Sequence, residues 1–350
     1  MNIEMWLKAI RIIPRLDKEE WDRLDVISRW LIASRFAVVI MTFISAAIAG
    51  LWAYRDGRFD ALYWLLTALG LMMAHATNNL LNDITDYKKG VDQDNYFRTQ
   101  YGPQPLTHGL MTMRQSLVYA AITGAIALLI GLFLVYARGP LTLALLAAGA
   151  FFVLFYTYPL KYIGLGEIAV LLVWGPLMIG GAYYVTTLRW DWTVVLVGLP
   201  YALGTTGVIF GKHIDKLKDD AAKKIHTLPV IIGERNARLV LAGATALQYI
   251  LVAGMMITGI LTPIMLIVFL AFPMFVRFFG VYMQPRPDGP PPLPLIPKSK
   301  IAALFTGQDY PPEGWPMWFV AMAFVHNRRF GMLFLLGLIL DVALHLWLGL

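Results

Sequence analysis

Long hydrophobic runs separated by short polar segments make up most of this chain. Each run is close to the roughly 20 residues that an α-helix needs to cross a membrane. The nine runs cover approximately residues 28–54, 61–81, 116–136, 140–158, 166–187, 193–211, 237–259, 262–282 and 330–349. The pattern therefore predicts an all-α, polytopic membrane protein built around a bundle of nine transmembrane helices.

Two of the runs end in stretches rich in aspartate. The second run leads into Asn79-Leu-Leu-Asn82-Asp83-Ile-Thr-Asp86, and the sixth leads into Lys212-His-Ile-Asp215-Lys-Leu-Lys-Asp219-Asp220. If the first helix continues to Asp86, then Asn79, Asp83 and Asp86 share one helix face. Such a row of oxygen ligands suits Mg²⁺, which takes one or two carboxylates and completes its shell with water and phosphate oxygens. Either stretch alone is equally typical of a solvated charge run, whereas the pair at two membrane exits indicates a metal-bridged diphosphate site.

Lysine and arginine fall mostly on one side of the predicted bundle. With the N-terminus placed inside, only Arg55, Arg58, Arg138 and Arg189 of the 29 lysines and arginines lie outside. Positive residues favour the cytoplasmic side of membrane helices, so the N-terminus, both acidic stretches and Lys161 are predicted to face the cytoplasm. The net charge of +7 then reports topology and contact with anionic lipid, and no nucleic acid is expected as a partner.

The composition supports a membrane protein, and the distribution of charged residues and prolines divides the chain into four segments. Charged residues make up 15% of it and hydrophobic residues 58%, whereas a soluble domain carries roughly 25% charged residues. There is no cysteine, so thiolate chemistry is excluded for these residues. Residues 1–27 are predicted to form an amphipathic cytoplasmic surface segment, residues 28–283 the main bundle, and residues 330–350 the last transmembrane helix. Residues 284–329 form a proline-rich cytoplasmic insertion, which we interpret as a linker or a lid.

Several blocks of residues, in the same order, resemble the UbiA superfamily of intramembrane prenyltransferases. The first block holds Asn79, Asn82, Asp83, Asp86, Gly90 and Asp92, followed by Arg98, Pro103, Pro105 and Gly109. A later block, Tyr156-Thr-Tyr158-Pro-Leu-Lys161, is similar to the family's Tyr-Pro-x-Lys segment, and Thr227-Leu-Pro-Val230 is similar to its final block. The continuation from Trp174 to Val185 looks most like the branch that prenylates 1,4-dihydroxy-2-naphthoate in the menaquinone pathway. The resemblance covers roughly residues 28–260.

The resemblance implies transfer of a polyprenyl group from its diphosphate to an aromatic acceptor, with Mg²⁺ and loss of pyrophosphate. It implies that Asp83, Asp86 and Asp215, with Asp219 or Asp220, are catalytic residues that hold the metal. Counting back from Thr227 selects Asp220, whereas the family's usual Asp-x-x-x-Asp spacing selects Asp219, so both stay open. Lys212 or His213 stands where the family has asparagine.

The resemblance also implies substrate-binding roles for polar and aromatic residues. The phosphate oxygens are expected to meet Lys161 and Arg98, with Asn79, Asn82 and Lys212 beside them. Arg35 binds phosphate or acceptor, or else its guanidinium reaches to lipid headgroups. Tyr156 and Tyr158 are expected to shield the allylic cation through their ring faces. Between them Tyr158 is favoured as a catalytic residue because it neighbours Lys161.

Two other interpretations stay open. The same fold can serve another acceptor, namely chlorophyllide, haem, homogentisate, 4-hydroxybenzoate or a glycerol lipid. A cation-coupled secondary transporter would show inverted repeats and carboxylates at helix centres, whereas the acids here sit at helix ends among lysines. The expected partners are polyprenyl diphosphate, an aromatic acceptor and the lipid bilayer, in a bacterial or archaeal plasma membrane with the active site facing the cytoplasm.

Overall fold

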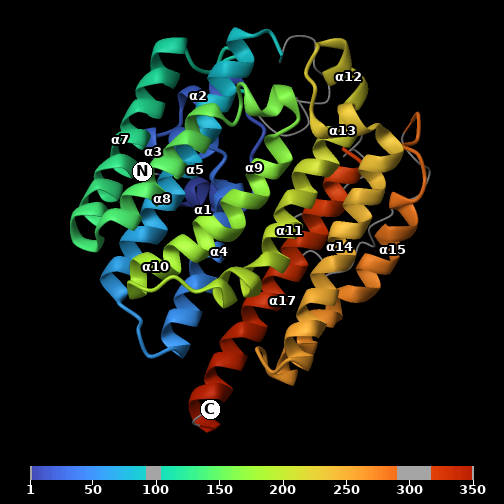
Figure 1. The fold of residues 1–350 in the computed structure, drawn as a ribbon. Coiled ribbons are helices and arrows are strands. Elements are labelled where there is room, and N and C mark those ends of the chain that lie inside the picture. The colour runs from blue at the N-terminus through green and yellow to red at the C-terminus, as the bar shows by residue number, and fades with distance from the viewer. Residues whose placement is uncertain (1, 92–103, 290–316, 349–350) are drawn as a thin grey trace.

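The computed structural model describes residues 2–91, 104–289 and 317–348, and within these ranges the protein is helical without a β-strand. Its helices are α1 (Ile3–Arg11), α2 (Lys18–Asp22), α3 (Val26–Ala33), α4 (Phe36–Arg55), α5 (Ala61–Lys88), α7 (Met113–Arg138), α8 (Pro140–Phe155), η1 (Leu160–Ile163), α9 (Gly166–Leu172), η2 (Val173–Gly180), α10 (Gly181–Thr187), α11 (Trp192–Asp215), α12 (Leu217–Ala222), α13 (Leu228–Ile232), α14 (Glu234–Ile257), η3 (Pro263–Ala271), α15 (Phe272–Tyr282) and α17 (Phe319–Leu348). Figure 1 shows the long helices side by side in one bundle, with α12 and α13 at one end and the C-terminus at the other.

Each predicted hydrophobic run is helical in the part of the chain that the structure describes. Seven helical segments are long and apolar enough to cross a membrane. They are α4, α7, the continuous segment α9–η2–α10, α11, α14, the segment η3–α15, and α17. The 16-residue α8 is shorter, and α5 also lies outside this set. An all-helical membrane bundle is therefore confirmed, while the count of nine crossings and the orientation of the N-terminus stay predictions.

The first and last runs differ from their predicted limits. Residues 28–54 form two helices, α3 and α4, because the backbone turns at Arg35, whose φ is 53°. A left-handed conformation costs a non-glycine residue about 1–2 kcal/mol, so tertiary contacts of Arg35 must offset that strain. The last helix begins at Phe319 rather than at residue 330, so the end of the predicted insertion belongs to α17.

Close packing against α17 explains the unusual composition of α11. This helix, the weakest sequence signal because of its glycines and Pro200, is the most enclosed of the seven segments. A Cβ atom at Gly211 would lie 2.8 Å from backbone atoms of Phe319, and one at Gly204 would lie 2.1 Å from Asn327 Oδ1. Small residues let membrane helices approach each other closely. The glycines of α11 are thus packing residues rather than helix breaks.

Replacing Gly211 by alanine is expected to weaken the contact between α11 and α17. The added Cβ would meet backbone rather than a flexible side chain, at a cost of about 1–3 kcal/mol. Thermal unfolding in detergent measures this as a lower melting temperature. Gly243→Ala on α14 is the matched control, because its Cβ would meet nothing within 4 Å. Equal melting temperatures for the two variants would contradict the packing described here.

Candidate functional site

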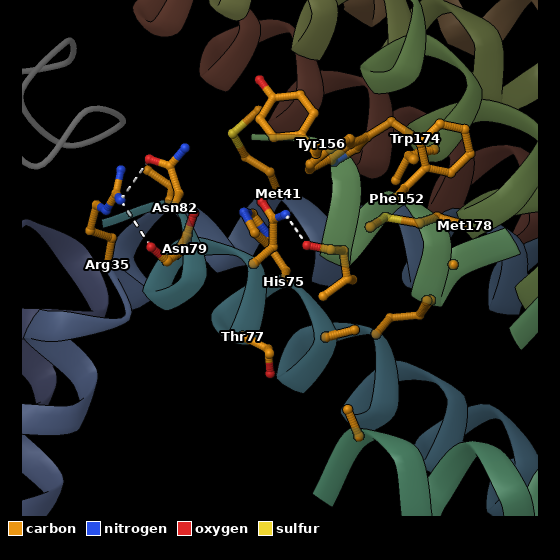
Figure 2. Close-up of a pocket in the computed structure, with 18 of the residues that line it drawn as sticks. Arg35, Met41, His75, Thr77, Asn79, Asn82, Phe152, Tyr156, Trp174 and Met178 are labelled. Atoms are coloured by element: carbon orange, nitrogen blue, oxygen red, sulfur yellow. Dashed lines mark hydrogen bonds between the residues drawn. The ribbon is translucent and has the colours of Figure 1, made fainter. Parts of the chain in front are cut away.

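The acid-bearing end of α5 is buried and lies against Arg35. Asn79, Asn82, Asp83 and Asp86 are each less than a tenth exposed. Arg35 donates hydrogen bonds to Asp83 Oδ1 at 2.5 Å and to the Asn79 carbonyl at 3.1 Å. Figure 2 shows the same guanidinium reaching Asn82, whose Oδ1 lies 3.4 Å away. These contacts hold Arg35 in its left-handed conformation.

The Tyr-Pro-x-Lys block is joined to α5 by a buried ion pair. Lys161 Nζ, on η1, lies 2.8 Å from Asp86 Oδ1, and both side chains are 8% exposed. Beside them, Asn82 donates a hydrogen bond to Thr157 Oγ1 at 3.0 Å. Buried charges are tolerated when they are paired, so this pair fixes Lys161 at the acid-bearing end of α5.

The second acidic stretch meets the other two blocks at the same end of the bundle. Lys223 Nζ donates to the Val91 carbonyl at 2.6 Å, which links the segment after α12 to the segment after α5. The His226 N–H donates to the Tyr162 carbonyl at 3.2 Å, which links it to the Tyr-Pro-x-Lys block. In Figure 1 this is the end marked by α12. Segments more than a hundred residues apart in the sequence therefore share one polar region.

Asp215 has a set of contacts that the sequence did not indicate. Its buried carboxylate accepts hydrogen bonds from the backbone N–H groups of Trp318 (2.9 Å), Phe319 (3.1 Å) and Val320 (3.0 Å) at the start of α17. Arg286 Nε lies 3.3 Å from its Oδ1. A carboxylate at a helix N-terminus satisfies N–H groups that have no partner within the helix. Both oxygens of Asp215 are engaged in this cap, and its ligation of a metal stays a prediction.

The remaining acids differ in their surroundings. Asp219 is exposed, whereas Asp220 is 3% exposed and lies 3.2 Å from Lys216 Nζ. Within residues 2–91, 104–289 and 317–348, no group of three or more His, Cys, Asp or Glu side chains is arranged to hold a metal ion. Asp83 and Asp86 lie three residues apart and so are neighbours on one side of α5. Two carboxylates suffice for Mg²⁺ when water and phosphate oxygens complete its shell, so this pair fits the ion.

A cavity of about 1170 Å³ begins at this polar region. It follows α5 from Thr67 to Asn82, a span of roughly 22 Å at 1.5 Å per residue. Six cationic side chains line it, and the described lining residues include no aspartate or glutamate: Lys8, Arg11, Arg15, Arg35, Lys212 and Arg328. Asn78, Asn79 and Asn82 add amides, and the rest of the wall is largely apolar. Such a cavity suits an amphiphile with an anionic head and a long apolar tail.

The two tyrosines of the Tyr-Pro-x-Lys block have different environments. Tyr156 lines the cavity, as do Trp174 and Phe152, and Figure 2 draws all three among the lining side chains. Tyr158, which the sequence favoured, is 49% exposed and is absent from the described cavity lining. The Lys89 Nζ atom lies 3.7 Å from the centre of the Tyr158 ring. The prediction for Arg98 falls outside the described residues.

Sequence reasoning missed several cavity residues. Lys8, Arg11 and Arg15 come from the N-terminal segment, which was interpreted only as a surface helix, and Arg328 comes from α17. Each is separated from the acidic stretches by a long span of sequence, and no local motif marks it. The alternation of basic and apolar residues in the N-terminal segment was the one available signal.

Comparison with known proteins adds a family match. The model of the UbiA prenyltransferase family matches residues 43–290. The 1,4-dihydroxy-2-naphthoate octaprenyltransferase of Mycobacterium tuberculosis is 28% identical over 73% of this chain and 85% of its own length. The protein of the same name from Bacillus subtilis is 26% identical over 65% of this chain and 73% of its own.

A solved structure has a similar fold. A UbiA homolog from Archaeoglobus fulgidus, bound to GPP and Mg²⁺, aligns with a TM-score of 0.53 over 90% of this chain and 99% of that one. The two sequences are 14% identical, so this likeness concerns the fold alone.

Replacing Asp215 by alanine is expected to destabilise the protein. Three backbone N–H groups at the start of α17, two of them buried, would lose their acceptor, and the expected cost is about 3 kcal/mol. The melting temperature in detergent should fall, whereas Asp219→Ala, at an exposed position, should leave it unchanged. If Asp215→Ala and the wild type have the same melting temperature, the carboxylate does not stabilise the position of α17.

Proposed function

Because this chain belongs to the UbiA prenyltransferase family, we propose that it is an integral-membrane, Mg²⁺-dependent enzyme that moves a polyprenyl group from its diphosphate to an aromatic acceptor. The favoured acceptor is 1,4-dihydroxy-2-naphthoate, which the names of both bacterial relatives contain. The observation that carries the proposal is the cavity, in which cations and amides adjoin a long apolar interior at the acid-bearing end of α5.

The chemistry requires stabilisation of charge on a leaving group. The bond between C1 of the prenyl chain and the diphosphate oxygen breaks, so an allylic cation forms as negative charge grows on pyrophosphate. Preorganised cationic groups stabilise that developing charge. Arg35 and Lys161 are the residues proposed for this task, because both are held at the polar region by α5.

The proposed metal site consists of Asp83 and Asp86. Bound Mg²⁺ would act as a Lewis acid on the diphosphate oxygens. In this structure the two carboxylates are neutralised by Arg35 and Lys161. A divalent ion held by the two carboxylates would supply that charge, so Arg35 and Lys161 would be available to phosphate oxygens as charge-assisted donors. To bind the metal, Asp215 would have to give up three backbone hydrogen bonds. We therefore propose that its main role is to cap the N-terminus of α17.

Aromatic groups would shield the cationic carbon. The face of an aromatic ring attracts a cation, by about 2 kcal/mol or more when water is excluded. Tyr156 and Trp174 both line the cavity beyond Asn79 and Asn82. We therefore propose Tyr156, in place of Tyr158, as the ring that the allylic cation meets.

The orientation and the choice of acceptor rest on separate arguments. The distribution of lysine and arginine supports an active site that faces the cytoplasm of a bacterial or archaeal cell. Another aromatic acceptor or a glycerol lipid would keep the same diphosphate chemistry. The acceptor is thus the part of the proposal that an assay must decide.

Purified wild-type protein is expected to release pyrophosphate from a polyprenyl diphosphate only when Mg²⁺ and 1,4-dihydroxy-2-naphthoate are both present. Asp83→Ala and Asp86→Ala are expected to lower the rate at least about a hundredfold, because metal-assisted charge stabilisation contributes several kcal/mol. Product formation is followed by mass spectrometry. Asp219→Ala serves as the exposed control on the second acidic stretch. Absence of release with every quinone precursor would refute the proposal.

Gly149 of α8 is expected to tune the length of the prenyl chain. It lines the cavity, and a Cβ placed there would meet nothing within 4 Å. A Gly149→Phe side chain would fill space proposed for the tail, so kcat/KM for long prenyl diphosphates should fall about tenfold more than for geranyl diphosphate. Gly243→Phe adds the same ring outside the cavity and should not change the ratio. An unchanged ratio in Gly149→Phe would place the tail elsewhere.

A further inference from the structure

The N-terminal arm, residues 2–25, is a packed part of the site region rather than a detached surface helix. Ala9 and Trp21 are each 1% exposed. They belong to the same buried apolar cluster as Leu80 and Ile84 of α5, which flank the first acidic residues. The arm lies outside the residues that the family model matches, 43–290.

Asp25 fixes the orientation of α1. Its carboxylate accepts hydrogen bonds from Asn2 N at 2.8 Å, Trp6 Nε1 at 3.0 Å and Ser28 N at 3.0 Å. The N–H of Ser28, donated to this carboxylate, holds the pKa of Asp25 well below its usual range. The Asp25 side chain thus joins the first turn of α1 to the start of α3.

The faces of α1 are specialised. Ile3, Leu7 and Ile10 are 60%, 59% and 39% exposed and form an apolar stripe suited to the membrane interface. Lys8 and Arg11, one turn apart and so neighbours on the helix, line the cavity. The helix therefore sets two cations between the lipid surface and the cavity.

The charge around the cavity favours an anion. The described lining carries lysines and arginines but no carboxylate, and low-dielectric walls focus such a field. Among the described residues neither Lys8 nor Arg11 forms an ion pair. Both residues are exposed, so they meet water-borne anions before the buried cations of the polar region do.

We propose that Lys8 and Arg11 bind the carboxylate of the aromatic acceptor at the cavity mouth and thereby select carboxylated acceptors. This inference rests on the prenyl transfer proposed above. Arg35 and Lys161 already occupy the acid-bearing end of α5, where the diphosphate is proposed to lie. The acceptor, in contrast, arrives from water, and a guanidinium binds a carboxylate through two parallel hydrogen bonds.

The double variant Lys8→Ala/Arg11→Ala tests the proposal in steady-state kinetics. The KM for 1,4-dihydroxy-2-naphthoate is expected to rise about tenfold, as for loss of charge-assisted hydrogen bonds, while kcat and the KM for polyprenyl diphosphate stay unchanged. The KM for 1,4-dihydroxynaphthalene, which lacks the carboxylate, should not change. Wild-type kcat/KM for the naphthoate should fall with ionic strength, and this dependence should weaken in the double variant.

Two further variants separate ligand binding from other effects. Arg23→Ala removes an exposed cation of the same arm that is paired with Glu19 and lies outside the cavity lining, so it should behave as wild type. Asp25→Ala keeps Lys8 and Arg11 but frees α1 from its anchor, so it should also raise the KM for the naphthoate. The single variant Arg11→Lys retains Lys8 and a positive charge at position 11. Its KM for the naphthoate should therefore lie between those of the wild type and the double variant.

Other outcomes would overturn the inference. A rise in the KM for polyprenyl diphosphate would make the arm part of the diphosphate site, and an equal effect on 1,4-dihydroxynaphthalene would remove the carboxylate from the argument. Loss of binding to anionic vesicles with unchanged acceptor KM would make the cations a lipid anchor. If the wild type releases no pyrophosphate, the prenyl transfer fails by itself. Equilibrium binding of the naphthoate, compared between wild type and double variant, then decides the role of the arm.

Discussion

The buried ion pair between Lys161 and Asp86 is the contact on which the geometry of the site depends. It joins α5 to the segment that follows α8, and the hydrogen bond from Asn82 to Thr157 reinforces it. Desolvating two charges costs more than their attraction commonly returns, so such a pair is weak as a device for stability alone. Charges inside a membrane bundle are instead typical of functional sites, which agrees with the proposed position of the diphosphate beside this pair.

The cavity has a charged end, near this ion pair, and a long apolar part. The acid-bearing end of α5 gathers the buried cations, and the cavity continues along the same helix between apolar walls. The left-handed backbone of Arg35 belongs to this arrangement: it lies at the turn between α3 and α4, and its guanidinium contacts Asn79 and Asp83. Residues with strained backbone conformations cluster at functional sites, which agrees with the proposed role of Arg35. The proposed amphiphilic substrate has the same two parts as the cavity.

Distant parts of the chain hold this region in place. Asp215, near the end of α11, caps the first turn of α17, and glycines on α11 let α17 pack against it. At the other terminus, Asp25 anchors α1 beside the cavity mouth. In the structure both carboxylates accept backbone or indole N–H groups. An acidic residue within a motif can therefore also cap a helix that lies far away in the sequence.

The sequence by itself determined the helical membrane class, the approximate helix limits and the blocks that form the polar region. These follow from run length, helical spacing and residue chemistry, which are local properties of the chain. It could not determine that Tyr156 rather than Tyr158 lines the cavity, that Asp215 lies under α17, or that Lys8 and Arg11 reach the cavity mouth. Each of these depends on which surfaces of separate helices pack together. Because that packing joins residues far apart in the chain, only the tertiary structure decided which charges share a pocket.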